Sequence, residues 1–190
     1  GGVGTDWSRL RGQNAPLQAS GLKSSGVIPF LKIMDSETLA ISRNSHRRGA
    51  SAAYLRIDHP DIEDFLEMRR PTGGDNDRKC LNINHGVVIT DEFMQAIENN
   101  SPYKLVDPHY QTVSKSLNAI DVWRRILTLR AETGEPYLLF IDNVNKAIPA
   151  HHRAQPPLSA RRRDGDFAPA ECGLRDEVQP DGQCFPRCRL

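Results

Sequence analysis

Short strand-like segments alternate with helical segments along most of this chain, and this alternation is the strongest constraint on its fold. Strand-like runs are expected at residues 50–57 (ASAAYLRI), 80–89 (CLNINHGVVI) and 135–142 (EPYLLFID). Helical spacing of apolar residues, or helix-start signals, are found at residues 27–41, 60–70, 91–99 and 116–134. Strands that alternate with helices predict an α/β fold, with a parallel sheet or a segment of a barrel.

The helix signals differ from segment to segment. Residues 27–41 carry apolar side chains at near-helical spacing, namely Phe30, Ile33, Met34, Leu39, Ala40 and Ile41. Thr90 is expected to cap the helix that follows it, and Gly134 to end the helix of residues 116–134. One face of that helix is predicted from Ile120, Trp123, Ile126, Leu127 and Ala131.

The helix that begins near Pro60 has Asp58 as a possible cap. Capping and the helix dipole explain the early carboxylates Asp61, Glu63 and Asp64. Residues 1–26 are expected to form a turn, a short segment and a flexible loop, and residues 101–115 to be irregular.

Composition excludes several classes of partner. The chain has 190 residues and a formal net charge of +1, which gives no electrostatic case for nucleic acid or a membrane surface. No apolar run approaches a membrane span of about 18–20 residues, and no secretory signal is evident. The first residue is Gly rather than Met, so we expect a fragment of something larger. Cys80 is alone in the first 150 residues, which predicts a reduced, cytoplasmic thiol and favours a small buried residue on a strand.

Residues 154–190 differ from the rest of the chain in amino-acid composition. They contain no Lys, Ile, Asn, Thr or Tyr and are rich in Arg, Pro and Cys. A disordered tail and a segment translated out of frame are both compatible with this composition. Cys172, Cys184 and Cys188 have no His at zinc-ligand spacing, so no metal site is predicted.

Two motifs suggest nucleotide contact. The opening GGVG could cradle a phosphate through backbone N–H groups, although a tight turn fits equally well. In the loop RNSHRRGA, Arg47 and Arg48 offer forked donors suited to phosphates or base edges, and Gly49 permits close approach of the backbone. A solvated charge cluster remains the alternative for this loop.

Four stretches in this order resemble the large (alpha, catalytic) subunit of ribonucleotide reductase over residues 1–153. They are GGVGTDWSRLRG, SSGVIPFLKIMD, RRGASAAYLRIDHPDIEDFLEMRRPTG and ILTLRAETGEPYLLFIDNVNK. The resemblance implies part of a ten-stranded α/β barrel and an enzyme that reduces ribonucleotides to deoxyribonucleotides by radical chemistry. Residues 154–190 lie outside it.

The resemblance also implies roles for individual residues. Gly2 matches a backbone glycine of the substrate pocket, and Arg11 an arginine that contacts effector phosphate at the first specificity loop. Arg47, Arg48, Gly49 and Ala50 match the second specificity loop, which would couple the bound effector to the accepted base.

Two departures limit what this chain is expected to do. Gln18 stands where some relatives carry a second phosphate-binding arginine. The catalytic run Asn-x-Cys-x-Glu does not follow NVNK, and Cys80 matches no catalytic position, so no catalytic residue is assigned and this chain alone is expected to be inactive.

The resemblance implies partners for the parent enzyme rather than cofactors bound by this chain. They are ribonucleotide substrates, deoxynucleoside triphosphate or ATP effectors, a second alpha subunit, a small beta subunit with a di-metal radical source, and a thioredoxin-type reductant. An adenosylcobalamin-dependent reductase and a non-catalytic nucleotide-binding module are the alternatives.

Overall fold

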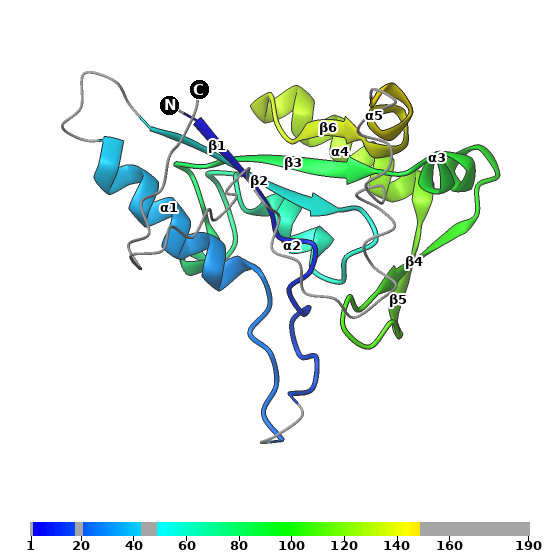
Figure 1. The fold of residues 1–190 in the computed structure, drawn as a ribbon, viewed down its shortest axis with the longest axis horizontal. Coiled ribbons are helices and arrows are strands. Elements are labelled where there is room, and N and C mark those ends of the chain that lie inside the picture. The colour runs from blue at the N-terminus through cyan, green and yellow to red at the C-terminus, as the bar shows by residue number, and fades with distance from the viewer. Residues whose placement is uncertain (1, 18–20, 43–48, 149–190) are drawn as a thin grey trace, which may run out of the picture.

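Strands and helices alternate in the computed structural model, which describes residues 2–17, 21–42 and 49–148 (Figure 1). The strands of this part of the chain are β1 (Gly2–Asp6), β2 (Ala50–Arg56), β3 (Asn84–Ile89), β4 (Pro102–Val106), β5 (Val113–Asn118) and β6 (Tyr137–Phe140). The helices are α1 (Ile28–Ser42), α2 (Ile62–Glu67), α3 (Asp91–Glu98), α4 (Ala119–Thr133) and α5 (Ile141–Ala147), with a 3₁₀ turn at Asn76–Arg78.

Four strands form one parallel sheet in the order β1-β2-β3-β6. This confirms the predicted α/β class and the parallel sheet. The described residues contain four parallel strands and a separate hairpin of β4 and β5, so the prediction that they are part of a ten-stranded barrel stays a prediction. The predicted tail, residues 154–190, lies outside the described residues.

The two faces of the sheet differ sharply in burial. On one face, Ala53 and Leu55 of β2 and Val87 and Ile89 of β3 are fully buried. Helices α1 and α2 pack against β2 (Figure 1), and α2 and α4 contribute Phe65 and other side chains to the same core. This face supplies the hydrophobic core of the sheet.

The other face carries small residues. Gly2 and Gly4 of β1 are exposed, as is Ala50 of β2, and Ala52 is half-buried. The ring of Tyr54 lies across the sheet between β1 and β3. A Cβ atom added at Gly86 would lie 2.5 Å from Tyr54 Cε1, and one added at Gly4 would lie 3.6 Å from Tyr54 Cε2.

A buried ion cluster joins the end of α4 to β3 and α2. Glu135 Oε2 accepts hydrogen bonds from His85 Nδ1 at 3.0 Å and from the His85 backbone N–H at 3.2 Å, and it lies 3.2 Å from Arg69 Nε. Burial raises the pKa of the Glu135 carboxyl, but the His85 hydrogen bonds and the Arg69 charge outweigh burial and lower this pKa below its usual value. The carboxylate is therefore ionised in the folded chain.

Several local predictions are confirmed. Helix α1, strand β2 and helix α3 lie where the periodicity places them. The Thr90 side chain caps α3 by accepting from the Phe93 N–H, and Gly134 ends α4 in the left-handed region with φ of 80°.

Residues 101–115 form a hairpin rather than an irregular segment, so that prediction is wrong. In β4, Tyr103 and Leu105 are buried while Pro102 and Lys104 are exposed, which is the alternation of a half-buried strand. The Val106 N–H donates to the Asp58 carbonyl at 2.8 Å, which ties the hairpin to the end of β2.

Other predictions are corrected by side-chain contacts. Residues 2–6 form β1, paired with β2, rather than a turn. Asp58 does not cap α2, because its carboxylate pairs with Arg56 at 3.1 Å. Cys80 is buried as predicted, but it precedes β3 instead of lying on it.

The buried faces of α1 and α4 also differ from expectation. In α1 the buried residues are Ile28, Leu31, Asp35 and Thr38, whereas Phe30, Ile33 and Ile41 are exposed. In α4 they are Ala119, Val122, Ile126 and Leu129, whereas Leu127 is exposed.

Replacing Glu135 with Gln (E135Q) should lower the free energy of unfolding at neutral pH by about 1–3 kcal/mol, because a carboxylate that accepts three contacts is lost. Since the folded pKa is depressed, this contribution is complete above the unfolded pKa of about 4.3. It is lost as the pH falls through the folded pKa. Urea unfolding at a series of pH values measures it, with E132Q as the exposed control. Parallel pH profiles for E135Q and the unsubstituted chain would contradict this assignment.

Replacing Gly86 with Ala (G86A) should cost about 1–2 kcal/mol and displace the Tyr54 ring, because the new Cβ atom would overlap it. The matched change G2A should stay within about 0.5 kcal/mol, since its nearest neighbour is the Ala50 carbonyl oxygen at 3.6 Å. Denaturant unfolding of both variants compares them. Equal stability of G86A and G2A would show that the Tyr54 ring moves aside without cost.

Candidate functional site

Three of the predicted site residues, Gly2, Gly49 and Ala50, meet at the amino ends of β1 and β2. Gly2 pairs in register with Ala50 across β1 and β2. Gly49 immediately precedes β2, and its carbonyl accepts a hydrogen bond from Ser42 Oγ at the end of α1. The predicted residues Arg47 and Arg48 lie outside the described residues. The register thus places Gly2, which is predicted to belong to a substrate pocket, beside Gly49 and Ala50, which are predicted to belong to a specificity loop.

Arg11 lies at the opposite end of the sheet. It follows β1 by five residues, whereas Gly49 precedes β2, and the two strands run parallel. The seven residues of β2 span about 20 Å. Within one chain the structure therefore does not bring Arg11 together with Gly49 and Ala50.

Residues 10–17 and 21–27, here called the arm, carry Arg11 away from the sheet and lead back to α1, and they project from the body of the molecule (Figure 1). Pro16 and Lys23 form an antiparallel bridge within the arm. Its base is held by Asp61, which is 5% exposed. Asp61 Oδ1 accepts from the Gln13 N–H at 2.7 Å, and Asp61 Oδ2 accepts from the Val27 N–H at 2.9 Å. One carboxylate thus fixes both ends of the arm.

His59 adds a third attachment at the same base. Its Nδ1 atom accepts from the Asp61 N–H at 3.1 Å, so its Nε2–H donates to the Leu10 carbonyl at 2.8 Å. Gly26 permits this close packing, because its φ is 83° and an added Cβ atom would lie 2.5 Å from Asp61 Oδ2.

The Arg11 side chain is held against an aromatic ring. Its guanidinium carbon lies 5.9 Å from the centre of the Tyr110 ring, within the range of a cation–π contact. Arg11 Nε is buried and makes no hydrogen bond. A half-buried guanidinium whose N–H groups are not all used within the described residues is suited to bind an anion.

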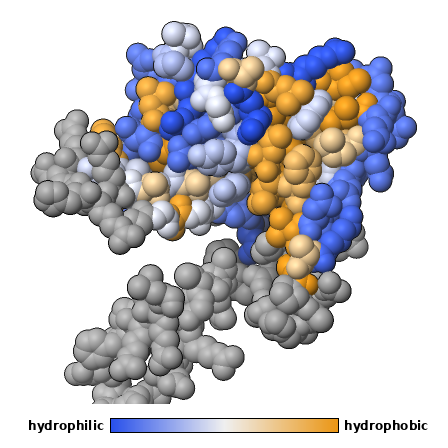
Figure 2. Space-filling model, turned by 90° about the horizontal axis from the view of Figure 1, so that it is seen from above, coloured by the Kyte–Doolittle hydropathy of each residue, from blue (hydrophilic) through white to orange (hydrophobic). Residues whose placement is uncertain are grey.

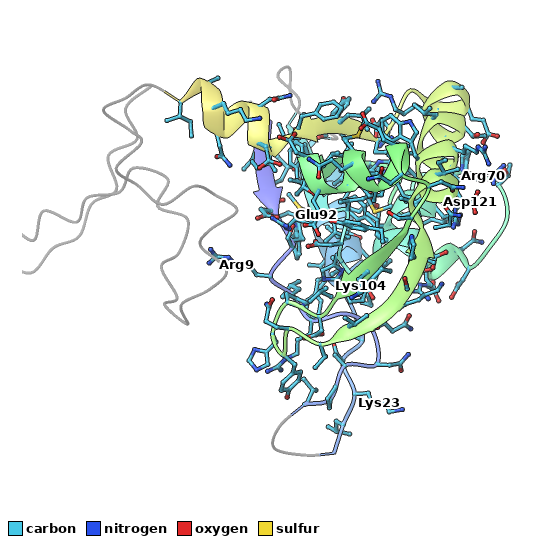
Figure 3. The ribbon with its side chains drawn as sticks, turned by 90° about the vertical axis from the view of Figure 1, so that its right-hand side faces the viewer. Arg9, Lys23, Arg70, Glu92, Lys104 and Asp121 are labelled. Atoms are coloured by element: carbon cyan, nitrogen blue, oxygen red, sulfur yellow. The ribbon has the colours of Figure 1, made fainter. Side chains whose placement is uncertain are left out.

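Most other arginines of the described ranges already have partners. Arg56, Arg69, Arg70, Arg78, Arg124 and Arg125 pair with carboxylates, and Arg130 donates to the Pro136 carbonyl. Arg11 and Arg9 have no carboxylate within ion-pair distance in this part of the chain. Arg9 is exposed and extends away from the ribbon (Figure 3), so Arg11 is the better placed of the two.

A pocket of about 430 Å³ lies between α3 and β4, and no motif in the sequence predicts it. Polar side chains on its wall include Asp58, Glu92 and Lys104 (Figure 3). Burial raises the pKa of Tyr103, on the same wall, to about 12, so its hydroxyl stays protonated.

Cys80 is poorly suited to act as a nucleophile, because its side chain is fully buried. Burial raises the pKa of its thiol to about 11, so the reactive thiolate does not form near neutral pH. Across the ranges that the structure describes, no three His, Cys, Asp or Glu side chains gather closely enough to hold a metal ion. No helix among them is long and apolar enough to span a membrane.

Sequence reasoning missed Asp61, His59 and Tyr110. Asp61 was assigned to helix capping, but α2 gains no side-chain cap from it. Nothing local marks Tyr110, because its contacts with the arm span 94 sequence positions or more.

Comparison with known proteins agrees with this architecture. The family model described as "Ribonucleotide reductase, barrel domain" matches residues 1–156. A protein of Frog virus 3 described as a ribonucleoside-diphosphate reductase large subunit is 45% identical over 148 residues, which cover 78% of this chain and 25% of that protein. The ribonucleoside-diphosphate reductase large subunit of Invertebrate iridescent virus 6 is 42% identical over 142 residues. These residues cover 71% of this chain and 15% of that protein.

A vitamin B12-dependent ribonucleoside-diphosphate reductase of Thermoplasma acidophilum is 33% identical over 150 residues, covering 78% of this chain and 19% of that enzyme. The chain thus spans a quarter or less of the length of these three curated relatives. The structure and the comparison agree. The described residues form a parallel α/β sheet, and the barrel-domain model matches most of the chain. The chain therefore belongs to the ribonucleotide reductase family, as part of the barrel domain of the large subunit.

Proposed function

We propose that this chain forms the effector-recognition and specificity part of a ribonucleoside-diphosphate reductase alpha subunit. In the whole protein, that subunit reduces ribonucleotides to deoxyribonucleotides by radical chemistry. One observation carries the proposal: Arg11 is half-buried and unpaired with any carboxylate of the described residues. Its remaining N–H groups suit a phosphate oxygen of a nucleotide effector.

The glycine-lined face of the sheet suits the substrate. Gly2, Gly4 and Ala50 leave the backbone accessible, and side chains there are small enough for a ligand to approach the strands. Gly2 and Ala50 are neighbours, so a loop that moves Ala50 would also alter the surface next to Gly2. This adjacency supports the coupling of the second specificity loop to substrate choice.

Radical chemistry requires groups that we place elsewhere in the parent enzyme. Cys80 is buried and protonated, and we assign no described residue to catalysis or to a cofactor. A di-metal beta subunit is our preferred radical source, because the viral relatives are described as large subunits. Adenosylcobalamin is the alternative, supported by the name of the Thermoplasma relative.

A second copy of the chain would complete the effector site. Helix α1 leads from the arm to the residues before Gly49, and its exposed side carries Phe30, Ile33 and Ile41. If two α1 helices pack antiparallel around a two-fold axis, the Arg11 end of one chain lies beside the Gly49 end of the other. This arrangement unites the two specificity elements that one chain keeps apart, and it buries the exposed apolar side of α1.

Replacing Arg11 with Ala (R11A) should weaken binding of dTTP or dATP about 10- to 100-fold, because a charge-assisted hydrogen bond to phosphate is lost. The rise in melting temperature that each nucleotide gives the unsubstituted chain measures the affinity. R9A, which removes an exposed arginine two residues away, should bind normally. The proposal fails if neither nucleotide raises the melting temperature of the unsubstituted chain, or if R11A binds as well as R9A.

Replacing Ile33 with Glu (I33E) should convert a dimer into a monomer, because Ile33 is 67% exposed on α1 and a charge there opposes apolar packing. Sedimentation velocity over a range of concentrations measures the association. V113E is the matched control, since Val113 is 55% exposed on β5. A monomeric unsubstituted chain, or equal loss of dimer in both variants, would remove the α1 interface.

A further inference from the structure

We propose that Tyr110, in the turn between β4 and β5, is a positioning residue that holds Arg11 for anion binding, an inference that rests on the proposed function of Arg11. Tyr110 contacts the arm twice. Its ring lies under the Arg11 guanidinium, and its hydroxyl donates to the Pro16 carbonyl at 3.2 Å. The arm is thus held by a residue that no local motif identifies.

The turn that presents Tyr110 is rigidly built. Asp107 is 5% exposed, and its Oδ1 atom accepts from the N–H groups of His109 and Tyr110, both at 2.9 Å. The Gln111 N–H donates to the Asp107 carbonyl at 2.9 Å, and Asp107 N–H donates to the Thr112 carbonyl at 2.9 Å. The His109 ring packs edge-on against Tyr110 at 4.7 Å. These contacts fix the direction of the Tyr110 side chain.

An aromatic partner suits a ligand-binding arginine better than a carboxylate does. A carboxylate occupies guanidinium N–H groups and neutralises their charge, as in the pairs of Arg56 and Arg125. A ring attracts the cation through its face and leaves the in-plane N–H donors available. Tyr110 therefore orients Arg11 without competing with a phosphate.

The turn and the arm share one support. The hairpin is attached to the Asp58 carbonyl through the Val106 N–H, and the arm to His59 and Asp61. Because these attachment points all lie within residues 58–61, which follow β2, one short piece of backbone sets the distance between the ring and the guanidinium.

The test compares Y110F, which keeps the ring and loses the hydroxyl, with Y110L, which loses both contacts. We expect dTTP affinity to fall no more than about 3-fold in Y110F and about 10-fold in Y110L, which is the size of a cation–π contact. Y137L is the matched control, because Tyr137 is an exposed tyrosine of β6 and belongs neither to the arm nor to the β4–β5 turn. In the R11A background, Y110L should have no further effect.

A second measurement does not depend on nucleotide. Phenylglyoxal should modify Arg11 faster in Y110L than in Y110F or the unsubstituted chain, while Arg9 in the same peptide serves as an internal reference. Equal rates for Arg11 in all variants would overturn the positioning role, as would a Y110L effect that persists without Arg11. Faster modification in Y110L together with no nucleotide binding by the unsubstituted chain would instead overturn the proposed function and leave the positioning of Arg11 supported.

Discussion

The Asp61 carboxylate holds the geometry on which the rest of the site depends. Its two oxygens accept from backbone N–H groups at Gln13 and Val27, which are the two ends of the arm. Hydrogen bonds to a charged group contribute about 1.5–3 kcal/mol each to the stability of a folded protein. Breaking one costs more when the acceptor is buried, because the acceptor is then left without a partner. Because the same segment also holds Leu10 through His59, the direction in which Arg11 leaves the sheet is fixed by side chains of the β2–α2 connection.

The surface agrees with a unit that is completed by other parts of a larger protein. Hydrophobic residues gather in a band across the face seen in Figure 2, flanked by hydrophilic residues. Exposed apolar side chains of the described residues include Val3 on β1, Tyr137 on β6 and Ile33 on α1. Contiguous apolar surface of this kind marks contact with further protein.

Elements were predictable from the sequence, whereas their orientation was not. The periodicity located α1, but Asp35 and Thr38 occupy its buried side, since Asn82 satisfies the Asp35 carboxylate and Ser51 the Thr38 hydroxyl. Polar groups with partners can be buried, so apolar spacing alone chose the wrong side of this helix. The hairpin was missed because Pro102 and Pro108 lie on either side of the short segment in which Tyr103 and Leu105 alternate with exposed residues.

The candidate site was predictable in individual residues such as Arg11, Gly2 and Gly49, but not in how these residues lie relative to one another. Arg11 stands out by its type and its place after a glycine-rich strand, but its unpaired state depends on the absence of nearby carboxylates in three dimensions. The pairing of Gly2 with Ala50 follows from strand register, which a single sequence does not specify for parallel strands with long connections. Tyr110 and Asp61 act across long sequence separations, through contacts that exist only in the folded chain.

Helix α1 lies between Arg11 and Gly49 along the chain, so its length sets the separation of the two specificity elements that we propose. Its 15 residues span about 22 Å. One inserted residue would lengthen the helix by about 1.5 Å and rotate everything beyond it by about 100°. Natural variants should therefore tolerate substitutions on the outer side of α1 far more readily than any insertion or deletion within it.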